Sequence, residues 1–391
     1  MIRNVKLYPV YDSTGEITIK VKVWTIRGSF SACATAGTSK GENEAKSLRY
    51  NEVVKVFPKV RNSLVGLDEA DWVTIDKILL QLDNSKDFRN IGGNLALATS
   101  LAVARAASEG ELWRLEGPKP RMSFPYPLGN VIGGAKHGGH STWQEFLVIP
   151  HKARDPEHAT RMNMEMWHTI GDELKRKGIL SGKNIENAWT CKLDCVKTLS
   201  FLSNIVEDWD AKMGIDFAAS SFWDGKNYVY NDLGRKISPE EHFDTVLQVA
   251  EQYKLYYIED PFHENDFKNF ADLKQCLPKT LVAGDDIFCT NAERLKKGIM
   301  KGSANGIIIK PNQIGTLSQA FQTAELARQN NIYTIASHRS RETYDDWLSD
   351  LSLLWKSPLI KIGNMGPDTM KHNRLIELWH DVPHNSMADL P

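Results

Sequence analysis

The sequence predicts an α/β protein in two parts, a small N-terminal unit of sheet followed by helices and a larger barrel of β–α units. Three observations support this prediction. Residues 3–30 alternate polar and apolar side chains in the manner of paired strands. Helical patterns then dominate from Asn51 to Glu116. Further on, short apolar runs ending in a polar residue recur at the spacing of a β–α unit, roughly 25 to 40 residues.

The N-terminal unit begins with two alternating runs joined by a turn at residues 12–15, which predicts an antiparallel hairpin. The stretch 34–49, A-T-A-G-T-S-K-G-E-N-E-A-K-S-L-R, predicts a loop of small residues leading into an amphipathic helix. Either a plain connection or a mobile lid fits this loop. The segment I-G-G-N-L-A-L-A-T-S-L-A-V-A-R-A-A-S predicts a helix packed tightly against a neighbour.

A domain boundary is expected where four prolines fall between residues 117 and 128. We therefore predict an N-terminal α+β domain at 1–120 and a barrel domain at 121–391.

Six apolar runs of the second part end in a polar residue, in the order Asp216, Glu259, Asp285, Lys310, His338 and Lys361. In a parallel β/α barrel of the TIM type, catalytic groups lie at the carboxyl ends of several strands. A doubly wound sheet would gather its site at one switch point, and no G-x-G-x-x-G follows a strand here. The pattern therefore favours the barrel.

Composition limits the partners. The 391 residues are 41% hydrophobic and 25% charged, as in ordinary soluble proteins, and the net charge of −1 gives no bulk attraction to nucleic acid or an anionic membrane. No signal peptide or transmembrane span is expected. The five cysteines form no C-x-x-C pair, so we expect reduced thiols and a cytoplasmic protein.

The three acids Asp216, Glu259 and Asp285 predict a metal site. Carboxylates that converge at one barrel mouth repel each other unless a cation joins them, and all-oxygen ligands favour Mg²⁺ or Mn²⁺ over zinc. Asp260 and Asp286 directly follow two of these acids, and we expect them to orient ligands or loops. The alternative is that each acid is a solvated strand end.

Lys310 closes the run G-I-I-I-K before Pro311. A lysine at the mouth of a buried strand is costly unless it is used. Beside a divalent cation and a second ammonium, its pKa is expected to fall from about 10.4 toward roughly 7 to 8. Lys310 is therefore a candidate base for a proton next to a carboxylate. The resulting enediolate needs concentrated positive charge, which metal ions supply.

The segment S-H-R-S supplies Arg339, whose planar donors suit phosphate or carboxylate, with Ser340 beside it. Lys361 adds another positive charge. Upstream, the glycine-rich loop G-G-A-K-H-G-G-H-S-T-W-Q-E-F enters an apolar strand. Its histidines, His137 and His140, are candidates for phosphate or acid–base contacts, or are simply exposed.

Several segments resemble the signature motifs of the enolase family, the phosphopyruvate hydratases of glycolysis. They are I-E-D-P-F (258–262), G-D-D-I-F-C-T-N (284–291), I-K-P-N-Q-I-G-T-L (309–317) and S-H-R-S-x-E-T (337–343). The loop G-T-S-K-G-E-N-E-A-K-S-L-R is similar to the mobile serine loop of that family. Independent motifs in the right order, nearly end to end, make the resemblance specific.

The resemblance implies a small N-terminal α+β domain before a modified (β/α)8 TIM-type barrel whose first strands are reordered, usually in a homodimer or higher homo-oligomer. It implies Mg²⁺-dependent dehydration of 2-phosphoglycerate, a phosphorylated hydroxy acid, to phosphoenolpyruvate. Asp216, Glu259 and Asp285 then hold the first Mg²⁺, and Ser39 reaches the second.

The resemblance also assigns the remaining roles. Lys310 takes the C2 proton, and Glu186 with Glu145 protonates the departing C3 hydroxyl. The substrate-binding residues are Lys361 at the carboxylate, Arg339 and Ser340 at the phosphate, and Gln144, His137 and His338 along the site. Because the loop before the Gln-Glu pair is one residue shorter than in the family, His140 competes with His137.

The chain departs from the family pattern in four segments. The G-D-E-G segment reads N-I-E-N at 184–187, although asparagine tolerates left-handed backbone better than most residues. Ser221 stands where glutamate is usual, and Arg341 replaces a glycine. The basic G-x-P-x-R-S-E-R segment reads G-N-M-G-P-D-T-M-K at 363–371.

Three functions remain open on sequence grounds. The first is an active enolase. The second is a relative acting on another 2-substituted carboxylate. Lys192 argues against this function, because such members carry a K-x-K pair where this chain has a single lysine. The third is a diverged enolase-like protein that binds a partner without catalysis.

Overall fold

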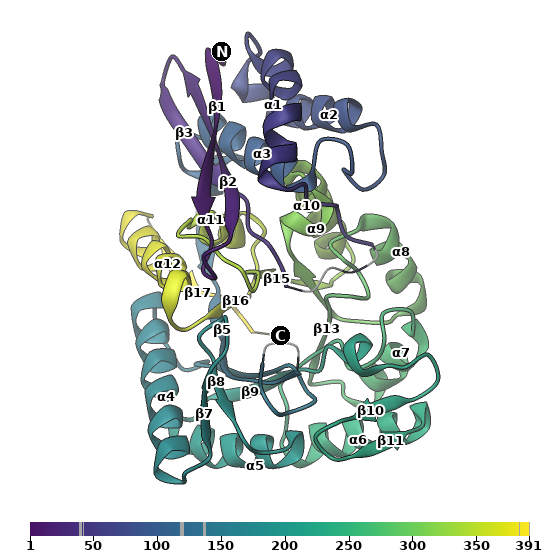
Figure 1. The fold of residues 1–391 in the computed structure, drawn as a ribbon. Coiled ribbons are helices and arrows are strands. Elements are labelled where there is room, and N and C mark those ends of the chain that lie inside the picture. Colours follow the sequence, from purple (N-terminus) through teal and green to yellow (C-terminus); the bar gives the residue numbers. More distant parts are fainter. Residues whose placement is uncertain (39–40, 42, 118–120, 136–137, 383, 391) are drawn as a thin grey trace.

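The computed structural model describes residues 1–391 except 39–40, 42, 118–120, 136–137, 383 and 391. A three-stranded sheet with helices lies at one end of the molecule, and a closed barrel surrounded by helices forms the rest (Figure 1). The predicted α/β fold is confirmed. Within these described ranges, no helix is long and apolar enough to cross a membrane.

The N-terminal sheet contains β1 (Asn4–Tyr11), β2 (Ile17–Thr25) and β3 (Gly28–Cys33), paired antiparallel in that order. Strand β2 buries alternate residues, as its sequence pattern requires. The Asp12 carboxylate accepts hydrogen bonds from the backbone N–H groups of Thr14 (2.9 Å) and Glu16 (3.1 Å), which fixes the turn. The predicted hairpin is confirmed.

Three helices pack on this sheet, α1 (Tyr50–Leu64), α2 (Trp72–Asp83) and α3 (Gly93–Ala107). Helix α3 is buried along nearly its whole length, because its small side chains let it lie close against β2 and β3. The stretch 34–49 contains no helix in its described part, and α1 begins only at Tyr50. The backbone of Ala36 instead pairs with Arg341 of the barrel, which holds this stretch extended.

Eight strands close the barrel, because β16 pairs with β5 as well as with β15. In barrel order they are β5 (Tyr126–Gly133), β6 (Glu145–Ile149), β9 (Lys212–Asp216), β12 (Tyr257–Glu259), β13 (Leu281–Gly284), β14 (Gly306–Ile309), β15 (Tyr333–Ser337) and β16 (Leu359–Gly363). Strand β6 runs antiparallel to β5 and β9, and every other neighbouring pair is parallel. The barrel is therefore of the modified kind.

The predicted strand ends are accurate to within two residues. Asp216 and Glu259 are the last residues of β9 and β12, whereas Asp285, Lys310 and His338 directly follow β13, β14 and β15. The prediction for Lys361 was wrong, because β16 continues to Gly363. Two further residues pair with β5 and so extend the strand beyond the lysine.

Helices follow the strands and cover the outside of the barrel (Figure 1). They are α4 (Pro156–Arg176), α5 (Cys195–Val206), α6 (Pro239–Gln252), α7 (Phe267–Cys276), α8 (Ala292–Lys301), α9 (Pro311–Ile314), α10 (Leu317–Gln329), α11 (Trp347–Leu354) and α12 (Thr369–Asp381). Several begin at an Asp, Ser or Asn whose side chain accepts a hydrogen bond from the first turn, as at Asp155, Asp194 and Ser238.

Short additions complete the barrel. A hairpin of β7 (Leu180–Lys183) and β8 (Trp189–Cys191) pairs with β5, and a second one joins β10 (Tyr228–Tyr230) to β11 (Arg235–Ile237). Strands β4 (Met122–Phe124) and β17 (Asn385–Met387) pair with each other.

The N-terminal sheet and helices contact the barrel at the carboxyl ends of its strands. Arg341 forms a two-way backbone bridge with Ala36 and an ion pair with Asp12 at 2.7 Å. Ser100 Oγ of α3 accepts a hydrogen bond from the N–H of Leu317, at the start of α10. The first part of the chain therefore covers the end of the barrel at which the predicted site residues lie.

Candidate active site

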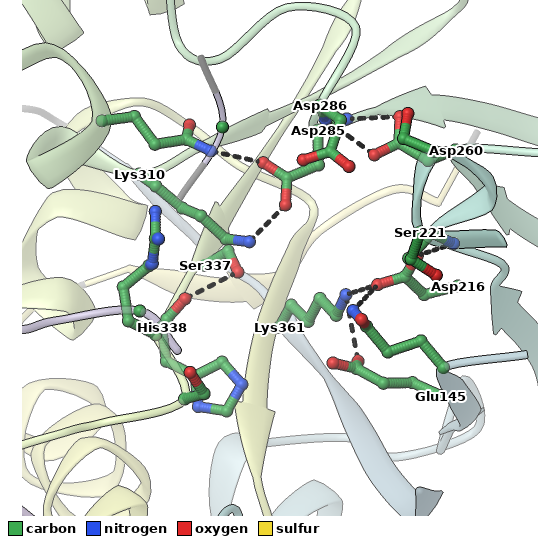
Figure 2. Close-up of a pocket in the computed structure, with 18 of the residues that line it drawn as sticks. Glu145, Asp216, Ser221, Asp260, Asp285, Asp286, Lys310, Ser337, His338 and Lys361 are labelled. Atoms are coloured by element: carbon green, nitrogen blue, oxygen red, sulfur yellow. Dashed lines mark hydrogen bonds and ion pairs between the residues drawn. The ribbon is translucent and has the colours of Figure 1, made fainter. Parts of the chain in front are cut away.

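A cavity of about 270 Å³ opens at the carboxyl ends of the barrel strands. Most residues predicted for the site line it: Gln144, Glu145, Glu186, Asp216, Asp285, Lys310, His338, Arg339, Ser340 and Lys361. Figure 2 shows that the labelled residues among them, from Glu145 and Asp216 to His338 and Lys361, converge on one space. The predicted residues Ser39 and His137 lie outside the described residues. The alternative histidine, His140, is exposed and is not among the lining residues.

Lys310 lies at the end of β14, where Pro311 starts the short helix α9. Its backbone N–H donates to Thr290 Oγ1 at 2.8 Å, and its ammonium forms an ion pair with Asp285. The second carboxylate oxygen of Asp285 accepts from Gln313 Nε2 at 2.8 Å. The lysine is thus held toward the cavity at a fixed position.

The fall in the pKa of Lys310 was expected beside a divalent cation, and it stays a prediction. Among the protein's own groups, burial lowers this pKa, but the nearby acids, chiefly Asp285 and then Glu259, together outweigh burial and raise the pKa of Lys310 above its ordinary value. The ammonium of Lys361 and the guanidinium of Arg339 act in the expected downward direction. The acids near the lysine outweigh these two effects.

Lys361 is buried among three carboxylates. Its Nζ lies 2.9 Å from Asp216, 2.8 Å from Glu259 and 3.0 Å from Glu145, and its side chain is 2% exposed. Burial lowers the pKa of Lys361, but these acids raise it well above the ordinary value. The lysine is therefore a permanent cation at the floor of the cavity.

The predicted metal ligands differ in their access to the cavity. Asp216 and Asp285 line it, whereas Glu259 lies behind, held by Lys361 and by the hydroxyl of Tyr257 at 2.6 Å. Burial and the neighbouring Asp216 raise the pKa of Glu259 to about 8. Burial and Asp285 raise the pKa of Asp286 to about 7.

Within the described ranges, the acids that come close enough to share one ion are Asp260, Asp285 and Asp286, whose ligand atoms lie within 4.8 Å of one another. The expected orienting role of Asp260 has direct support, because its two oxygens accept the N–H groups of Asp285 (3.0 Å) and Asp286 (2.7 Å). Carboxylates outnumber lysines among the lining residues. Burial, and then the neighbouring carboxylates, account for the raised pKa values of Glu259 and Asp286. This oxygen-rich set fits hard divalent cations such as Mg²⁺.

Glu186 lies in the turn between β7 and β8 and reaches the cavity despite the loss of both flanking glycines. The side-chain oxygen of Asn184 accepts from the N–H groups of Glu186 (3.0 Å) and Ala188 (2.8 Å). Asn187 takes the left-handed conformation with φ of 63°. Asn130 Nδ2 then donates to the Glu186 carboxylate at 3.0 Å, which orients it.

Arg339 and Ser340 are buried beside the N-terminal stretch. Arg339 pairs with Glu44 at 3.1 Å, and Ser340 Oγ accepts from the N–H of Thr38 at 2.9 Å. A Cβ atom at Gly37 would lie 1.9 Å from Arg339 Nη2, so a larger residue there would displace the guanidinium. Glu44 was not predicted as a site residue, although it belongs to the loop motif that resembles the serine loop.

Other lining residues were also missed. Gln313 and Ser337 line the cavity and belong to the motifs at 309–317 and 337–343, although no role was assigned to them. Ser220 and Glu264 line it without a local pattern that marks them. Ser221, which replaces a glutamate of the family pattern, lines it as well, so a short hydroxyl side chain stands where a longer acid is usual. Gln144, which was expected to line the site, donates a hydrogen bond from Nε2 to Asp216 at 3.3 Å.

Comparisons with known proteins agree with this geometry. Residues 2–115 match the family model described as "Enolase, N-terminal domain", and residues 121–387 match "Enolase, C-terminal TIM barrel domain". Proteins named Enolase are similar over nearly their full length. The one from Methanothermobacter thermautotrophicus is 36% identical (100% of this chain, 99% of the relative), that from Archaeoglobus fulgidus 38% (97% of each), and that from Sulfurisphaera tokodaii 39% (97% and 96%).

Proposed function

The chain belongs to the enolase family, and from this membership we propose that it dehydrates 2-phosphoglycerate to phosphoenolpyruvate as a hydro-lyase (phosphopyruvate hydratase) of glycolysis and gluconeogenesis. The observation that carries the proposal is the shared cavity of Lys310 and Glu186. Strands β15 and β16 separate the strand of Lys310 from β5, on which the Glu186 hairpin pairs. A base and an acid can therefore act on a small substrate from different sides.

The residues divide the reaction into two proton transfers. Lys310 Nζ, once released from Asp285, takes the proton from C2, and Lys361 stabilises the negative charge that gathers on the carboxylate. Glu186, with Glu145, gives a proton to the C3 hydroxyl, so that the C3–O bond breaks and water leaves. Gln144, His137 and His338 line the substrate.

Arg339 and Ser340 bind the phosphate in this proposal. Because Arg339 is paired with Glu44, the phosphate has to replace the Glu44 carboxylate as the partner of the guanidinium. Two Mg²⁺ ions would supply positive charge that lowers the pKa of the C2 proton. Asp285 would hold one of them with Asp216 and Glu259, once these two acids give up their ion pairs with Lys361, and Ser39 would reach the other. A bound cation would also compete with Lys310 for Asp285.

The domain division, location and oligomeric state are proposed from the same family membership. We propose an N-terminal domain of residues 1–120 that covers a catalytic domain of residues 121–391, a cytoplasmic location, and a homodimer or higher homo-oligomer. Small phosphorylated hydroxy acids are the proposed partners, without nucleic acid or membrane.

The test is Mg²⁺-dependent formation of phosphoenolpyruvate from 2-phosphoglycerate, followed by its absorbance. Lys310→Ala is expected to lower kcat by about 10²- to 10⁴-fold, because it removes a general base. Chelation of Mg²⁺ should abolish the signal, and fresh Mg²⁺ should restore it.

A panel of other 2-substituted carboxylates separates the alternatives. The proposal is overturned if 2-phosphoglycerate gives no signal above the Lys310→Ala protein. Turnover of another acid would then identify a different activity, and calorimetry without binding of Mg²⁺ or substrate analogue would point to a non-catalytic protein.

A further inference from the structure

His338 contacts a buried acid, Asp368, that none of the sequence motifs indicated. Its Nδ1 lies 2.7 Å from Oδ2 of Asp368, and the two side chains are 3% and 4% exposed. Asp368 ends the short 3-10 turn η6 (Gly366–Asp368) just before α12, within the segment that departs from the basic pattern of the family. Figure 2 shows His338 beside the cavity.

Asp368 is itself fixed on three sides. The same oxygen accepts the N–H of Gly363 at 3.0 Å, at the end of β16. Its other oxygen lies 3.0 Å from Lys371 Nζ, which also forms an ion pair with Glu342 at 3.0 Å. Glu342 in turn accepts the backbone N–H of Arg339 at 2.9 Å. Alternating charges on Asp368, Lys371 and Glu342 thus connect the acid behind His338 to Arg339, the residue next to it in sequence.

This arrangement is costly unless the charges are used or fully paired, because each member is buried. Of the four residues His338, Asp368, Lys371 and Glu342, His338 is the one that lines the cavity. Since Asp368 engages Nδ1, Nε2 is the ring nitrogen left for a ligand. An acceptor at Nδ1 fixes the tautomer and favours a protonated ring.

The other groups that face His338 act together with Asp368. Glu186 from the β7–β8 hairpin and Glu342 also favour its protonated form, and these acids outweigh burial, so that the pKa of His338 is raised. Lys371 and His372 lie nearby on α12. The pKa of His372 is lowered to about 4 by burial, so it remains neutral and does not oppose the charge on His338.

We propose that Asp368 is a positioning residue that holds His338 with Nδ1 protonated and Nε2 presented to the cavity as a cationic hydrogen-bond donor for the anionic substrate. The inference rests on the proposed function for the identity of that substrate. The juxtaposition of Asp368 and His338 itself does not depend on it. Lys371 and Glu342 keep the Asp368 carboxylate in place.

The experiment combines a titration with kinetics. Histidine-labelled protein is titrated by NMR, with His338→Gln used to assign the signal, and KM and kcat for 2-phosphoglycerate are measured across pH. Asp368→Asn is expected to lower the pKa of His338 by about one pH unit or more. KM should then begin to rise at a correspondingly lower pH, with a smaller change in kcat. Asp368→Glu, which keeps the charge, should recover part of the shift.

Asp350→Asn is the matched control, because Asp350 is also buried and ion-paired, at 2.9 Å from Arg374, but does not contact His338. It should lower stability without moving the titration or the KM profile. The proposal is overturned if Asp368→Asn leaves the titration of His338 unchanged, or if wild-type His338 titrates at an ordinary pKa, a result that needs no folded variant. A shifted titration in a protein without activity would instead count against the proposed function alone.

Discussion

The side-chain oxygen of Asn184 accepts the backbone N–H groups of both Glu186, at 3.0 Å, and Ala188, at 2.8 Å. This single side chain organises the turn that carries the proposed acid. Asn187 completes the turn in the left-handed conformation, and its carbonyl oxygen accepts from Trp167 Nε1 at 2.9 Å. Asn187 therefore takes a backbone conformation that suits glycine, whereas Asn184 holds the turn with a side chain that the glycine of the family pattern lacks.

Replacing Asn184 by Ala should misplace Glu186, because two backbone donors lose their acceptor. We expect kcat to fall about tenfold with little change in KM, since a loss of about 1.4 kcal/mol of transition-state stabilisation is a factor of ten. Steady-state kinetics measure the effect. Asn187→Gly is the control and should stay near wild type, because glycine adopts the same backbone freely. An unchanged kcat in Asn184→Ala would show that the turn is held by other contacts.

Replacing Lys361 by Met should destabilise the metal-free protein by about 3–5 kcal/mol, because it leaves Asp216, Glu259 and Glu145 buried without their shared cation. The loss should shrink at low pH, where the carboxylates become neutral. Urea unfolding at two pH values measures it. Lys197→Ala, which breaks an exposed ion pair, should leave stability nearly unchanged. Equal losses in the two variants would contradict the role given to Lys361.

The acids with raised pKa values predict how Mg²⁺ affects stability. Glu259, with a pKa of about 8, and Asp286, of about 7, bind protons more tightly in the folded protein than in the unfolded chain. The stability that this tighter proton binding adds is therefore fully present below about pH 4, the pKa of these acids in the unfolded chain. It is lost as pH rises through about 7 to 8, their pKa values in the folded protein. The free energy of unfolding in chelator should fall across this window.

Saturating Mg²⁺ should oppose that fall, because a cation binds the deprotonated carboxylates. Thermal unfolding with chelator and with Mg²⁺ measures both curves. Glu259→Gln should flatten the chelator curve, since it removes one titrating group. A gain from Mg²⁺ that is no larger above pH 8 than near pH 5 would contradict this account.

Arg341 should stabilise this protein more than the glycine that the family pattern has at this position. It forms an ion pair with Asp12, whose side chain is fully buried, and so joins the N-terminal hairpin to the segment that carries Arg339 and Ser340. Burial raises the pKa of Asp12, but hydrogen bonds from Thr14 and Arg341 outweigh it and lower the pKa. We expect Arg341→Gly to cost about 1–3 kcal/mol in denaturant unfolding. A double-mutant cycle with Asp12→Asn measures the coupling, and strictly additive losses would show that the pair contributes nothing.

The fold was predictable where a local pattern reports it. Apolar runs ending in polar residues gave the parallel strands, and their ends placed Asp216, Glu259, Asp285, Lys310 and His338 at one mouth. The family resemblance implied only that the first strands are reordered. The antiparallel direction of β6 was not predicted, because a strand has the same composition in either direction. The end of β16 was misplaced for a related reason, since pairing with β5 rather than composition sets its length.

The missed parts of the site are contacts between residues far apart in sequence. Glu44 opposite Arg339 and Asp368 opposite His338 form pairs that no spacing rule reveals. The pKa of Lys310 also depends on such a contact, because Asp285 pairs with it in the metal-free protein. The turn at Glu186 was easier to predict from the sequence, because the tolerance of asparagine for left-handed backbone is a property of the residue itself.

The central claim is that Lys310 removes the C2 proton while Glu186 serves the departing hydroxyl. Following the C2 hydrogen tests it most directly. With 2-phosphoglycerate deuterated at C2, NMR measures loss of deuterium to water in the presence of Mg²⁺. Wild type and Glu186→Gln should lose deuterium, although Glu186→Gln forms little phosphoenolpyruvate, and Lys310→Ala should lose none. Loss of deuterium by Lys310→Ala at the wild-type rate would contradict the account.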